Sequence, residues 1–538
     1  MTGSAAPGSR TSASGIPLRP VYRPADITGQ DYDRDLGEPG RYPYTRGRHA
    51  SGATGAWIQR ELSGEGSPRR SNEQFRQLIA AGAAGVDVIG DTATMALLDP
   101  DHPMAGPAVG AAGVSLCRLQ DYIELYEGMP LERITFSHSL NAAFCVAGLY
   151  LAVRHHGYDP VAVRGSVINA PVYAEDCGYA TQFPYDLRMR LALDTVAFCS
   201  KKMPRFHSFI EDTYFISDGG LDAVEEMALG FVEIREMTRL LIERGVPVDE
   251  FAPRIAILVN CRMDLFEEIA KIRATRRLYA RMMRDEFGAT DPRSLAVNVT
   301  VHTSGLTLTA PQPVNNVVRG AVQALAMAMA GVQAIEISTF DEAFRTPGHE
   351  AHVVALRTQQ VIAEETGVGR VADPLGGSWF VESLTTELER RISDKVAEIE
   401  RAGPIGQLAE DGYFRSIFTR GMDRHARSLR SGRLRQVGVN CHQMRPEEDT
   451  LLRELAQARF EPDTAHIARI IDWRAGRDQA RVQAALDTFT AAAADRGADL
   501  LGPIMDGFTA GATQGEMARA LRLGYGLPAD PLAFGGTR

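Results

Sequence analysis

The sequence predicts an α/β protein built on a closed (β/α)8 barrel of the TIM type, with an extended N-terminal arm and a small helical C-terminal region. Between about residues 70 and 400, short β-rich runs alternate with longer helical patterns. Eight such runs are present, and eight strands alternating with helices favour a closed barrel over an open doubly wound sheet. No GxGxxG motif follows the first run, which argues against a dinucleotide-binding fold.

The expected strands are the β-rich runs themselves. They cover residues 86–89, 113–116, 134–137, 165–168, 208–210, 255–259, 295–299 and 334–337. Between them, the stretches 221–243 and 264–287 carry apolar residues at helical spacing and predict amphipathic helices.

Composition divides the chain into three regions. Residues 1–45 are rich in Gly, Ser, Pro and Thr and predict a flexible arm. Residues 46–410 hold the barrel. Residues 411–538 are expected to form a connector and a helical region that contacts the barrel or a partner, with an Arg- and Gly-rich connecting stretch at about 401–445 and a helix over 477–495.

Charge and motifs exclude several classes of protein. The net charge of -10 argues against a nucleic-acid partner, which would require a basic face. No apolar run reaches the ~20 residues that span a bilayer, so no membrane partner is expected. No HExxH, GxSxG or Walker-type motif is present. The cysteines are scattered without a CxxC pair, which predicts no metal site and a reducing, cytoplasmic location: Cys117, Cys145, Cys177, Cys199, Cys261 and Cys441.

In such barrels the chemistry takes place where the strands end. Each polar residue at these ends could be a structural group, but together they form a plausible site. A barrel with these small, polar and aromatic walls suits a reaction in which a cofactor performs the difficult step. The residues concerned are Asp91, Ser137, His138, Asn169, Glu211, Asp212, Tyr214, Asn260, His302 and Ser338.

Six sequence strings resemble the methylmalonyl-CoA mutase family, in order and in spacing, over roughly residues 40 to 445. They are DEFAPR at 249–254, EIAKIRATRRLY at 268–279, TSG at 303–305, NNVVR at 315–319, FDEA at 340–343 and DPLGGS at 373–378. One such string would be weak evidence, whereas six in register are strong.

The resemblance implies a (β/α)8 barrel through which an acyl-CoA threads toward adenosylcobalamin, and a radical rearrangement of the acyl carbon skeleton. In the family, a separate domain with a DxHxxG signature binds the cobalamin, and this sequence contains no such signature. It looks like the large subunits of isobutyryl-CoA and 2-hydroxyisobutyryl-CoA mutases. The resemblance therefore implies a small cobalamin-binding partner subunit, in a heterotetramer of two large and two small subunits.

Two substrate-reading positions depart from the methylmalonyl-CoA mutase pattern. Leu62 stands where those enzymes have a Tyr, and Gly178 stands where they have an Arg that binds the substrate's carboxylate. Neither residue can pair with a buried carboxylate. The resemblance thus predicts a non-carboxylated and bulkier acyl group, unless Arg188 or Arg190 replaces the lost charge.

The catalytic positions also depart from the family. Tyr214 matches the family's Tyr, but Phe215 occupies the position of the active-site His. Phe215 can shield a radical but cannot donate a hydrogen bond to the thioester carbonyl. We expect His302 to supply the missing donor, and Asn169 matches a family Asn at the end of its strand.

The remaining positions carried over from the family contact either CoA or cobalamin. Small residues on the cobalamin side would let a flat ring approach the backbone. The expected CoA contacts are Ser166, Val167, Ile168, Arg205, Arg277, Leu278 and Tyr279, and the expected cobalamin contacts are Gly90, Ala112, Asp218, Gly305 and Glu342.

Two other functions stay open at this point. The first is a non-catalytic or regulatory barrel that lost the active-site His. The second is a cobalamin-independent barrel enzyme that uses Glu211, Asp212 and His302 for acid–base chemistry.

Overall fold

Eight parallel strands form a closed barrel, as the sequence predicts. The computed structural model describes residues 10–50, 57–179, 181–457 and 461–532. Each strand pairs in parallel with the next, and β8 pairs with β1, so the sheet has no free edge. The strands are β1 (Ile58–Ser63), β2 (Gly85–Ile89), β3 (Thr135–Ser139), β4 (Gly165–Ile168), β5 (Phe206–Asp212), β6 (Ile255–Cys261), β7 (Asn298–Thr303) and β8 (Ala334–Glu336).

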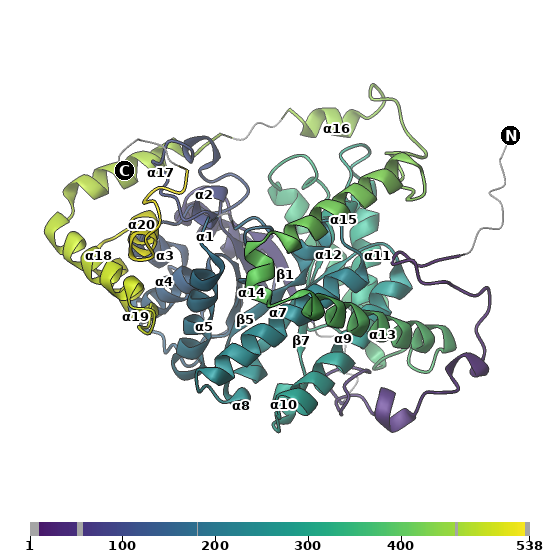
Figure 1. The fold of residues 1–538 in the computed structure, drawn as a ribbon. Helices are drawn as coiled ribbons and strands as arrows, with labels where there is room; N and C mark the ends of the chain where they lie inside the picture. Colours follow the sequence, from purple (N-terminus) through teal and green to yellow (C-terminus); the bar gives the residue numbers. More distant parts are fainter. Residues whose placement is uncertain (1–9, 51–56, 180, 458–460, 533–538) are drawn as a thin grey trace.

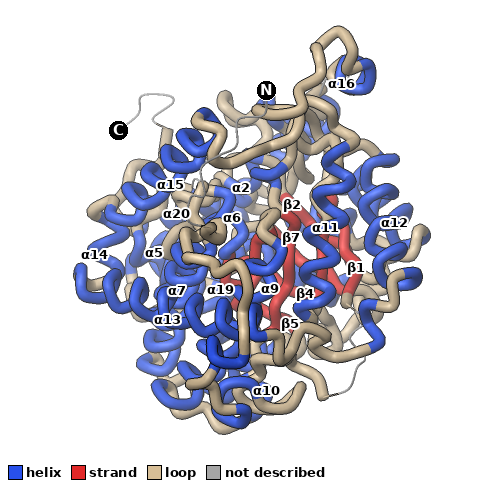
Figure 2. The backbone as a smooth tube through the Cα atoms, turned by 90° about the vertical axis from the view of Figure 1, so that its right-hand side faces the viewer, coloured by secondary structure: helices blue, strands red, loops and turns tan. Residues whose placement is uncertain are grey.

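Helices surround the barrel, and Figure 2 shows them in blue around the red strands. The helices predicted at 221–243 and 264–287 are confirmed as α7 and as α9 with its continuing π-turn. The longer barrel helices are α1 (Pro68–Ala80), α4 (Ala142–His155), α5 (Tyr185–Lys202), α7 (Ala223–Glu243), α9 (Leu265–Arg281), α11 (Asn315–Ala330), α12 (His349–Glu365) and α13 (Trp379–Ala402). Short helices in the loops are α2 (Thr92–Met95), α3 (Leu119–Leu125), α6 (Thr213–Asp218), α8 (Val248–Phe251) and α10 (Pro292–Leu295).

Two of the strand assignments made from the sequence are wrong. Residues 113–116 form no strand, because this segment is a loop in which Val114 makes only isolated bridges to Gly66 and Gly90. The true first strand, β1, has no long apolar run, since the buried residues Arg60 and Glu61 lie in its middle. The strand expected at 295–299 begins later, at residue 298, because α10 extends to residue 295.

Side chains alternate between the barrel interior and the surrounding helices. Apolar residues on the outward face, such as Val86 and Ile257, are fully buried against the helices. Inward-facing residues contact one another across the strands: the Ser166 Oγ donates to the Ser137 Oγ at 2.9 Å, and Arg60 pairs with Glu336. The interior is therefore more polar than a barrel packed with branched aliphatic residues.

The region after the barrel is more helical than predicted. The expected connector at 401–445 contains α14 (Ile405–Glu410) and α15 (Tyr413–Arg430), because Phe414, Ile417 and Phe418 give α15 an apolar face that is buried against the barrel. Helices α18 to α20, in yellow in Figure 1, pack against one another, and α19 packs against α4 and α5, whereas α17 lies near α2. The C-terminal helices are α16 (Thr450–Leu455), α17 (Thr464–Gly476), α18 (Gln479–Ala494), α19 (Leu501–Ala510) and α20 (Gln514–Gly524). None of the helices in the described ranges is long and apolar enough to cross a membrane.

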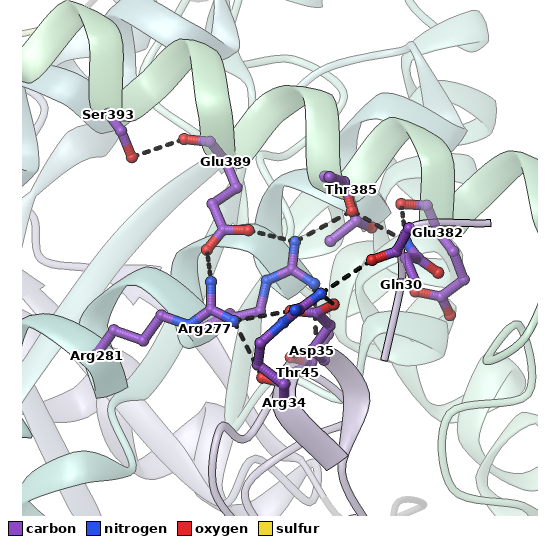
Figure 3. A network of polar contacts seen from close by, with 12 residues as sticks. Gln30, Arg34, Asp35, Thr45, Arg277, Arg281, Glu382, Thr385, Glu389 and Ser393 are labelled. Atoms are coloured by element: carbon purple, nitrogen blue, oxygen red, sulfur yellow. Dashed lines mark hydrogen bonds and ion pairs between the residues drawn. The ribbon is translucent and has the colours of Figure 1, made fainter. Parts of the chain in front are cut away.

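The described part of the N-terminal arm lies along α9 and α13 (Figure 3). It is extended apart from single turns at Pro24–Ile27 and Tyr32–Leu36. The carboxylate of Asp35 accepts from Arg34 at 2.6 Å and from Arg281 on α9 at 3.0 Å. These contacts attach the arm to the outside of the barrel.

Candidate functional site

The C-terminal ends of the strands bring together most of the residues that the sequence predicts for catalysis and cobalamin binding. All eight strands are parallel, so these ends lie on one side of the barrel. The residues on this side are Leu62 in β1, Gly90 after β2, Ala112 in the following loop, Asn169 after β4, Tyr214, Phe215 and Asp218 in α6, His302 in β7, Gly305 after β7 and Glu342 after β8.

Tyr214 is held in place by its neighbours on β6 and β7. Its ring stacks on His302 with 4.6 Å between ring centroids and 15° between planes. Its hydroxyl accepts from the Gly305 amide at 3.3 Å. Burial raises the pKa of Tyr214, and the nearby carboxylate of Asp218 raises it further. The hydroxyl is therefore protonated at neutral pH.

Asp218 is fixed by two donors on the same oxygen. Asn260 donates from Nδ2 at 2.6 Å, and Ser304 donates from Oγ at 2.9 Å. Sequence reasoning placed Asn260 at a strand end but did not assign it a role. Its role here is to position Asp218 and, through it, Tyr214.

The hydrogen bonds of His302 determine its tautomer. The Ser338 Oγ lies 2.7 Å from the Thr303 carbonyl oxygen and must donate to it, so Ser338 accepts from the His302 Nε2 at 3.1 Å. Burial lowers the pKa of His302 to about 4, so the ring is neutral. Neutral His302 therefore presents an acceptor at Nδ1, which differs from the donor role expected for it.

Phe215 lies against the edge of Tyr214, with ring centroids 5.4 Å apart. It is partly buried and has no polar group to offer. Asn169, the other predicted catalytic residue, donates hydrogen bonds from its side-chain amide to the carbonyls of Ala192 and Ser208. The site therefore offers apolar and aromatic walls, and its amide donors are occupied by the protein.

Small residues line the C-terminal face where the family would place cobalamin. Ala112 has φ of 51°, and the following residue, Gly113, lies directly against the backbone of Gly90. A Cβ on Gly305 would lie 3.0 Å from the Tyr214 hydroxyl and 3.1 Å from Asp218. Ala112 is exposed and Gly305 is partly exposed, and these small residues fit the approach of a flat ring, whereas Gly90 is buried against Leu140 and Gly113.

The barrel axis is lined by small hydroxyl residues on one side and by charges on the other. Ser166 and Ile168 face the interior, as expected for a thioester arm, whereas Val167 points into the outer core. On the opposite side the Arg60 Nη1 lies 3.5 Å from the Glu336 Oε1. Burial raises the pKa of Glu336, and the charge of Asp87 raises it further. No sequence pattern indicates this charged cluster, because its members lie inside strands.

Arginines surround the N-terminal mouth of the barrel. Arg164, Arg205 and Arg254 each stand directly before a strand. Burial lowers the pKa of Arg254, and the charges of Arg48, Arg293, Arg205 and Arg164 lower it further. Of these five, only Arg293 forms an ion pair with an acidic residue of the described chain.

Four of these five arginines have no acidic partner among the described residues, so the mouth concentrates positive charge, as an anion site does. Arg205 was predicted for this role. Arg164 and Arg254 were missed, although their position immediately before a strand matches that of Arg205.

The predicted triplet on α9 is divided between two environments. The Arg277 guanidinium lies 2.5 Å from Glu389 and donates to the Asp35 carbonyl, so it holds the arm (Figure 3). Leu278 packs against the outer core. Tyr279 is fully buried close to Arg48, and its hydroxyl has no partner among the described residues. Of these three residues, only Tyr279 lies at the N-terminal mouth.

Arg190 does not replace the lost substrate-reading Arg. Its guanidinium donates to the carbonyls of Ala492, Ala493, Asp495 and Ala498 and fastens the C-terminal helices. Arg188 instead lines a small cavity near Gly178, with its Nη1 3.9 Å from Glu175.

Comparison with known proteins agrees with this geometry. The sequence profile of the family described as methylmalonyl-CoA mutase matches residues 11–527. The chain belongs to the methylmalonyl-CoA mutase family. It is 36% identical over 516 residues to the 2-hydroxyisobutanoyl-CoA mutase large subunit of Aquincola tertiaricarbonis, covering 94% of this chain and 90% of that protein.

Methylmalonyl-CoA mutases are similar over the same part of this mutase. That of Cereibacter sphaeroides is 34% identical and that of Escherichia coli 32% identical, and the matches cover 95% and 96% of this chain and 72% of each relative. This mutase is thus an isomerase of a cobalamin-dependent family, and its barrel is the fold that the resemblance implied.

Proposed function

We propose that this chain is the large, substrate-binding subunit of an adenosylcobalamin-dependent mutase that rearranges the carbon skeleton of a non-carboxylated acyl-CoA. The similarity to a protein named as a large subunit extends over nearly the whole of both chains. A small partner subunit would hold most of the cobalamin.

The observation that carries this proposal is the arginine-lined N-terminal mouth. Arg48, Arg164, Arg205 and Arg254 have no acidic partner in the described chain. CoA carries its phosphate groups at one end and the acyl thioester at the other. Phosphates at this mouth would direct the pantetheine arm along the axis past Ser166 and place the acyl group at the C-terminal face.

At that face the chain's residues enclose and orient the acyl group. When bound, adenosylcobalamin would supply an adenosyl radical that removes a substrate hydrogen, and the small residues Ala112 and Gly305 would give its ring room to approach. Tyr214 and Phe215 form a wall that keeps water from the reacting carbons. His302, stacked on Tyr214, keeps that wall rigid and offers an acceptor at Nδ1.

A non-carboxylated acyl group follows from the charges around it. Leu62 and Gly178 carry no charge, and Arg190 is committed to the C-terminal helices. Arg188 lies beside Glu175, which offsets its charge. A free carboxylate on the acyl group would thus be buried without a free cation, at a cost of several kcal/mol.

We also propose an assembly of two large and two small subunits in the cytoplasm. The C-terminal face, which carries Gly305 and Glu342, is where the small subunit would bring its cobalamin. A reducing compartment accords with the six cysteines, all of which are free thiols.

Binding and turnover measurements test the proposal. The purified chain is titrated with free CoA, dephospho-CoA, pantetheine and a panel of acyl-CoAs, and its melting temperature is followed. Stabilisation by the CoA esters and little by pantetheine is the expected result, since a ligand that binds the native state raises the melting temperature. Turnover is then measured after addition of adenosylcobalamin and a small subunit encoded nearby.

Two outcomes contradict parts of the proposal. Failure of every CoA compound to bind would remove the acyl-CoA assignment. Tight binding without turnover in the complete assembly would favour the alternative, a non-catalytic mutase-like barrel, which is the function that Phe215 in place of His suggests.

A further inference from the structure

A buried cluster of three charged side chains lies directly behind the residues that carry Tyr214. Lys271 and Glu268 on α9 and Glu226 on α7 form this lysine cluster, and all three are nearly inaccessible to solvent. The Lys271 Nζ donates to the Glu226 Oε2 at 2.8 Å and lies 2.6 Å from the Glu268 Oε2. Burial would lower the pKa of Lys271, but the charges of the two glutamates outweigh it and raise that pKa, so the ammonium group is charged.

Lysine is rare in this chain, so a buried lysine is informative. Only four of the 58 Lys and Arg residues are lysines, and the other three, Lys201, Lys202 and Lys395, are exposed or partly exposed. An ammonium group is a compact charge with three donors, whereas a guanidinium group is a flat fork that suits one carboxylate. Lys271 contacts acceptors on α7, α9 and β6 at once, which suits an ammonium group.

The lysine cluster binds both polar groups of the Asn260 backbone, near the end of β6. The Lys271 Nζ donates to the Asn260 carbonyl at 2.7 Å, and the Asn260 amide donates to the Glu226 Oε1 at 3.3 Å. The side chain of Asn260 in turn donates to Asp218 at 2.6 Å and to the Tyr214 carbonyl at 3.3 Å. The cluster therefore holds the residue that orients Asp218 and Tyr214.

Glu226 also contacts the start of α6, the short helix that carries Tyr214. The Thr213 Oγ1 lies 3.2 Å from the Glu226 Oε1 and 3.0 Å from the Leu258 carbonyl oxygen. Thr213 is the first residue of α6 and directly precedes Tyr214. One carboxylate thus connects the two segments, the end of β6 and the start of α6, between which the backbone of Tyr214 is held.

Stability alone does not account for a buried cluster of one base and two acids. Removing charges from water is costly, and well-packed apolar side chains of similar volume often give equal or greater stability. Apolar side chains could not, however, bond to the backbone of Asn260 or to the hydroxyl of Thr213. The specific contribution of the lysine cluster is therefore the position of these two residues.

We propose that Glu226 and Lys271 are positioning residues for Tyr214. They fix the backbone on which Tyr214 depends, so its ring stays stacked on His302 at the C-terminal face. This inference rests on the proposed function, in which Tyr214 forms part of the wall beside the reacting carbons.

An uncharged replacement of the lysine cluster tests the proposal. The variant Glu226→Met, Glu268→Gln, Lys271→Met removes the buried charges and every bond from the cluster to Asn260 and Thr213. Hydrogen exchange at the amides of residues 213–218 should become about tenfold faster or more, the effect of losing a buried charge-assisted hydrogen bond. The affinity for free CoA, measured by calorimetry, should not change, because CoA is expected at the opposite end of the barrel.

Turnover is measured with a small subunit, adenosylcobalamin and an acyl-CoA that the wild type converts. The kcat should fall about 10- to 100-fold with little change in KM, because displacing a group beside the reacting atoms by about 1 Å costs roughly that much rate. Glu226→Gln is a milder second variant, since it leaves Lys271 paired with Glu268. It should change exchange and kcat in the same direction, because hydrogen bonds to a neutral acceptor are weaker.

A second buried cluster of one base and two acids provides the matched control. Arg273, also on α9, pairs with Asp373 and Glu382. The hydrogen bonds and ion pairs of these three side chains reach no residue of α6 or β6 in the described ranges. The variant Arg273→Met, Asp373→Asn, Glu382→Gln should therefore keep the wild-type exchange at residues 213–218 and the wild-type kcat.

Three results would overturn the inference and leave the acyl-CoA function in place. The first is unchanged exchange at residues 213–218 in both Glu226 variants. The second is an equal increase in the control variant, which would indicate a general loss of stability. The third is faster exchange with an unchanged kcat. Failure of the wild-type chain to bind free CoA would instead remove the proposed function itself.

Discussion

Replacing Arg254 with Gln should weaken the binding of every CoA ester while leaving the fold intact. Arg254 is partly buried at the N-terminal mouth and is surrounded by four other arginines, whose charges together with burial lower its pKa. Within the described chain its guanidinium makes one hydrogen bond, from Nε to the Pro204 carbonyl at 2.7 Å. Its charge is therefore repelled by its neighbours in the free protein and becomes favourable only beside a phosphate.

The expected magnitude follows from these two effects. Loss of one hydrogen bond of about 1 kcal/mol is offset by relief of repulsion, so the free energy of unfolding should change by less than about 1 kcal/mol. Loss of a charge-assisted bond to phosphate costs about 1.5–3 kcal/mol, which weakens CoA binding roughly 10- to 150-fold. Added salt should lower the wild-type affinity more than that of the variant.

Titration of both proteins with an acyl-CoA and with the matching acyl-pantetheine measures the effect. The difference should appear with the CoA ester and vanish with the pantetheine ester, which lacks the phosphates of CoA. Arg239→Gln, on the outer surface of α7, is the control and should change neither affinity. Undiminished binding of free CoA by Arg254→Gln would refute the assignment of the N-terminal mouth.

Three further predictions concern the arm and the C-terminal face. Asp35→Asn should lower the free energy of unfolding by about 2 kcal/mol at pH 7, because hydrogen bonds from Arg34 and then Arg281 lower the pKa of Asp35. That stabilisation is present above the ordinary pKa of about 4 and is lost as the pH falls below it, so denaturation curves of wild type and variant should converge in acid. His302→Ala should lower turnover at least tenfold, since it removes the stacking on Tyr214. Folded His302 stays neutral down to about pH 4 while the unfolded residue protonates near 6.5. As the pH falls between those two values, the free energy of unfolding should therefore decrease less in the variant than in wild type. Unchanged turnover of the variant would remove His302 from the mechanism. Phe215→His should lower turnover of the natural substrate about tenfold by placing a polar ring in the apolar wall; activity that arises only in this variant would instead indicate a barrel that had lost catalysis.

The grouping of these residues at the C-terminal face could be predicted from the sequence to a large extent. Tyr214, Phe215 and Gly305 follow strands, His302 lies near the end of one, and parallel strands bring their ends together by geometry alone. The acceptor role of His302 could not be predicted from the sequence, because its tautomer depends on a hydrogen bond to Ser338, which is 36 residues away along the chain.

The positions on α9 show another limit. A family motif identifies Arg277 and Tyr279 as neighbours in sequence, but a helix turns successive side chains in different directions. Arg277 therefore contacts the N-terminal arm, while Tyr279 faces Arg48 at the N-terminal mouth.

The sequence by itself determined the barrel, the long helices between its strands and the family, because these depend on local periodicity and on motifs in register. It could not show β1, whose Arg60 is stabilised by Glu336 on β8, nor the cluster of arginines at the N-terminal mouth, which come from separate segments of the chain. Only the tertiary structure decided these features. Burial and pairing are properties of side chains that meet across the barrel, and no pattern within a single segment records them.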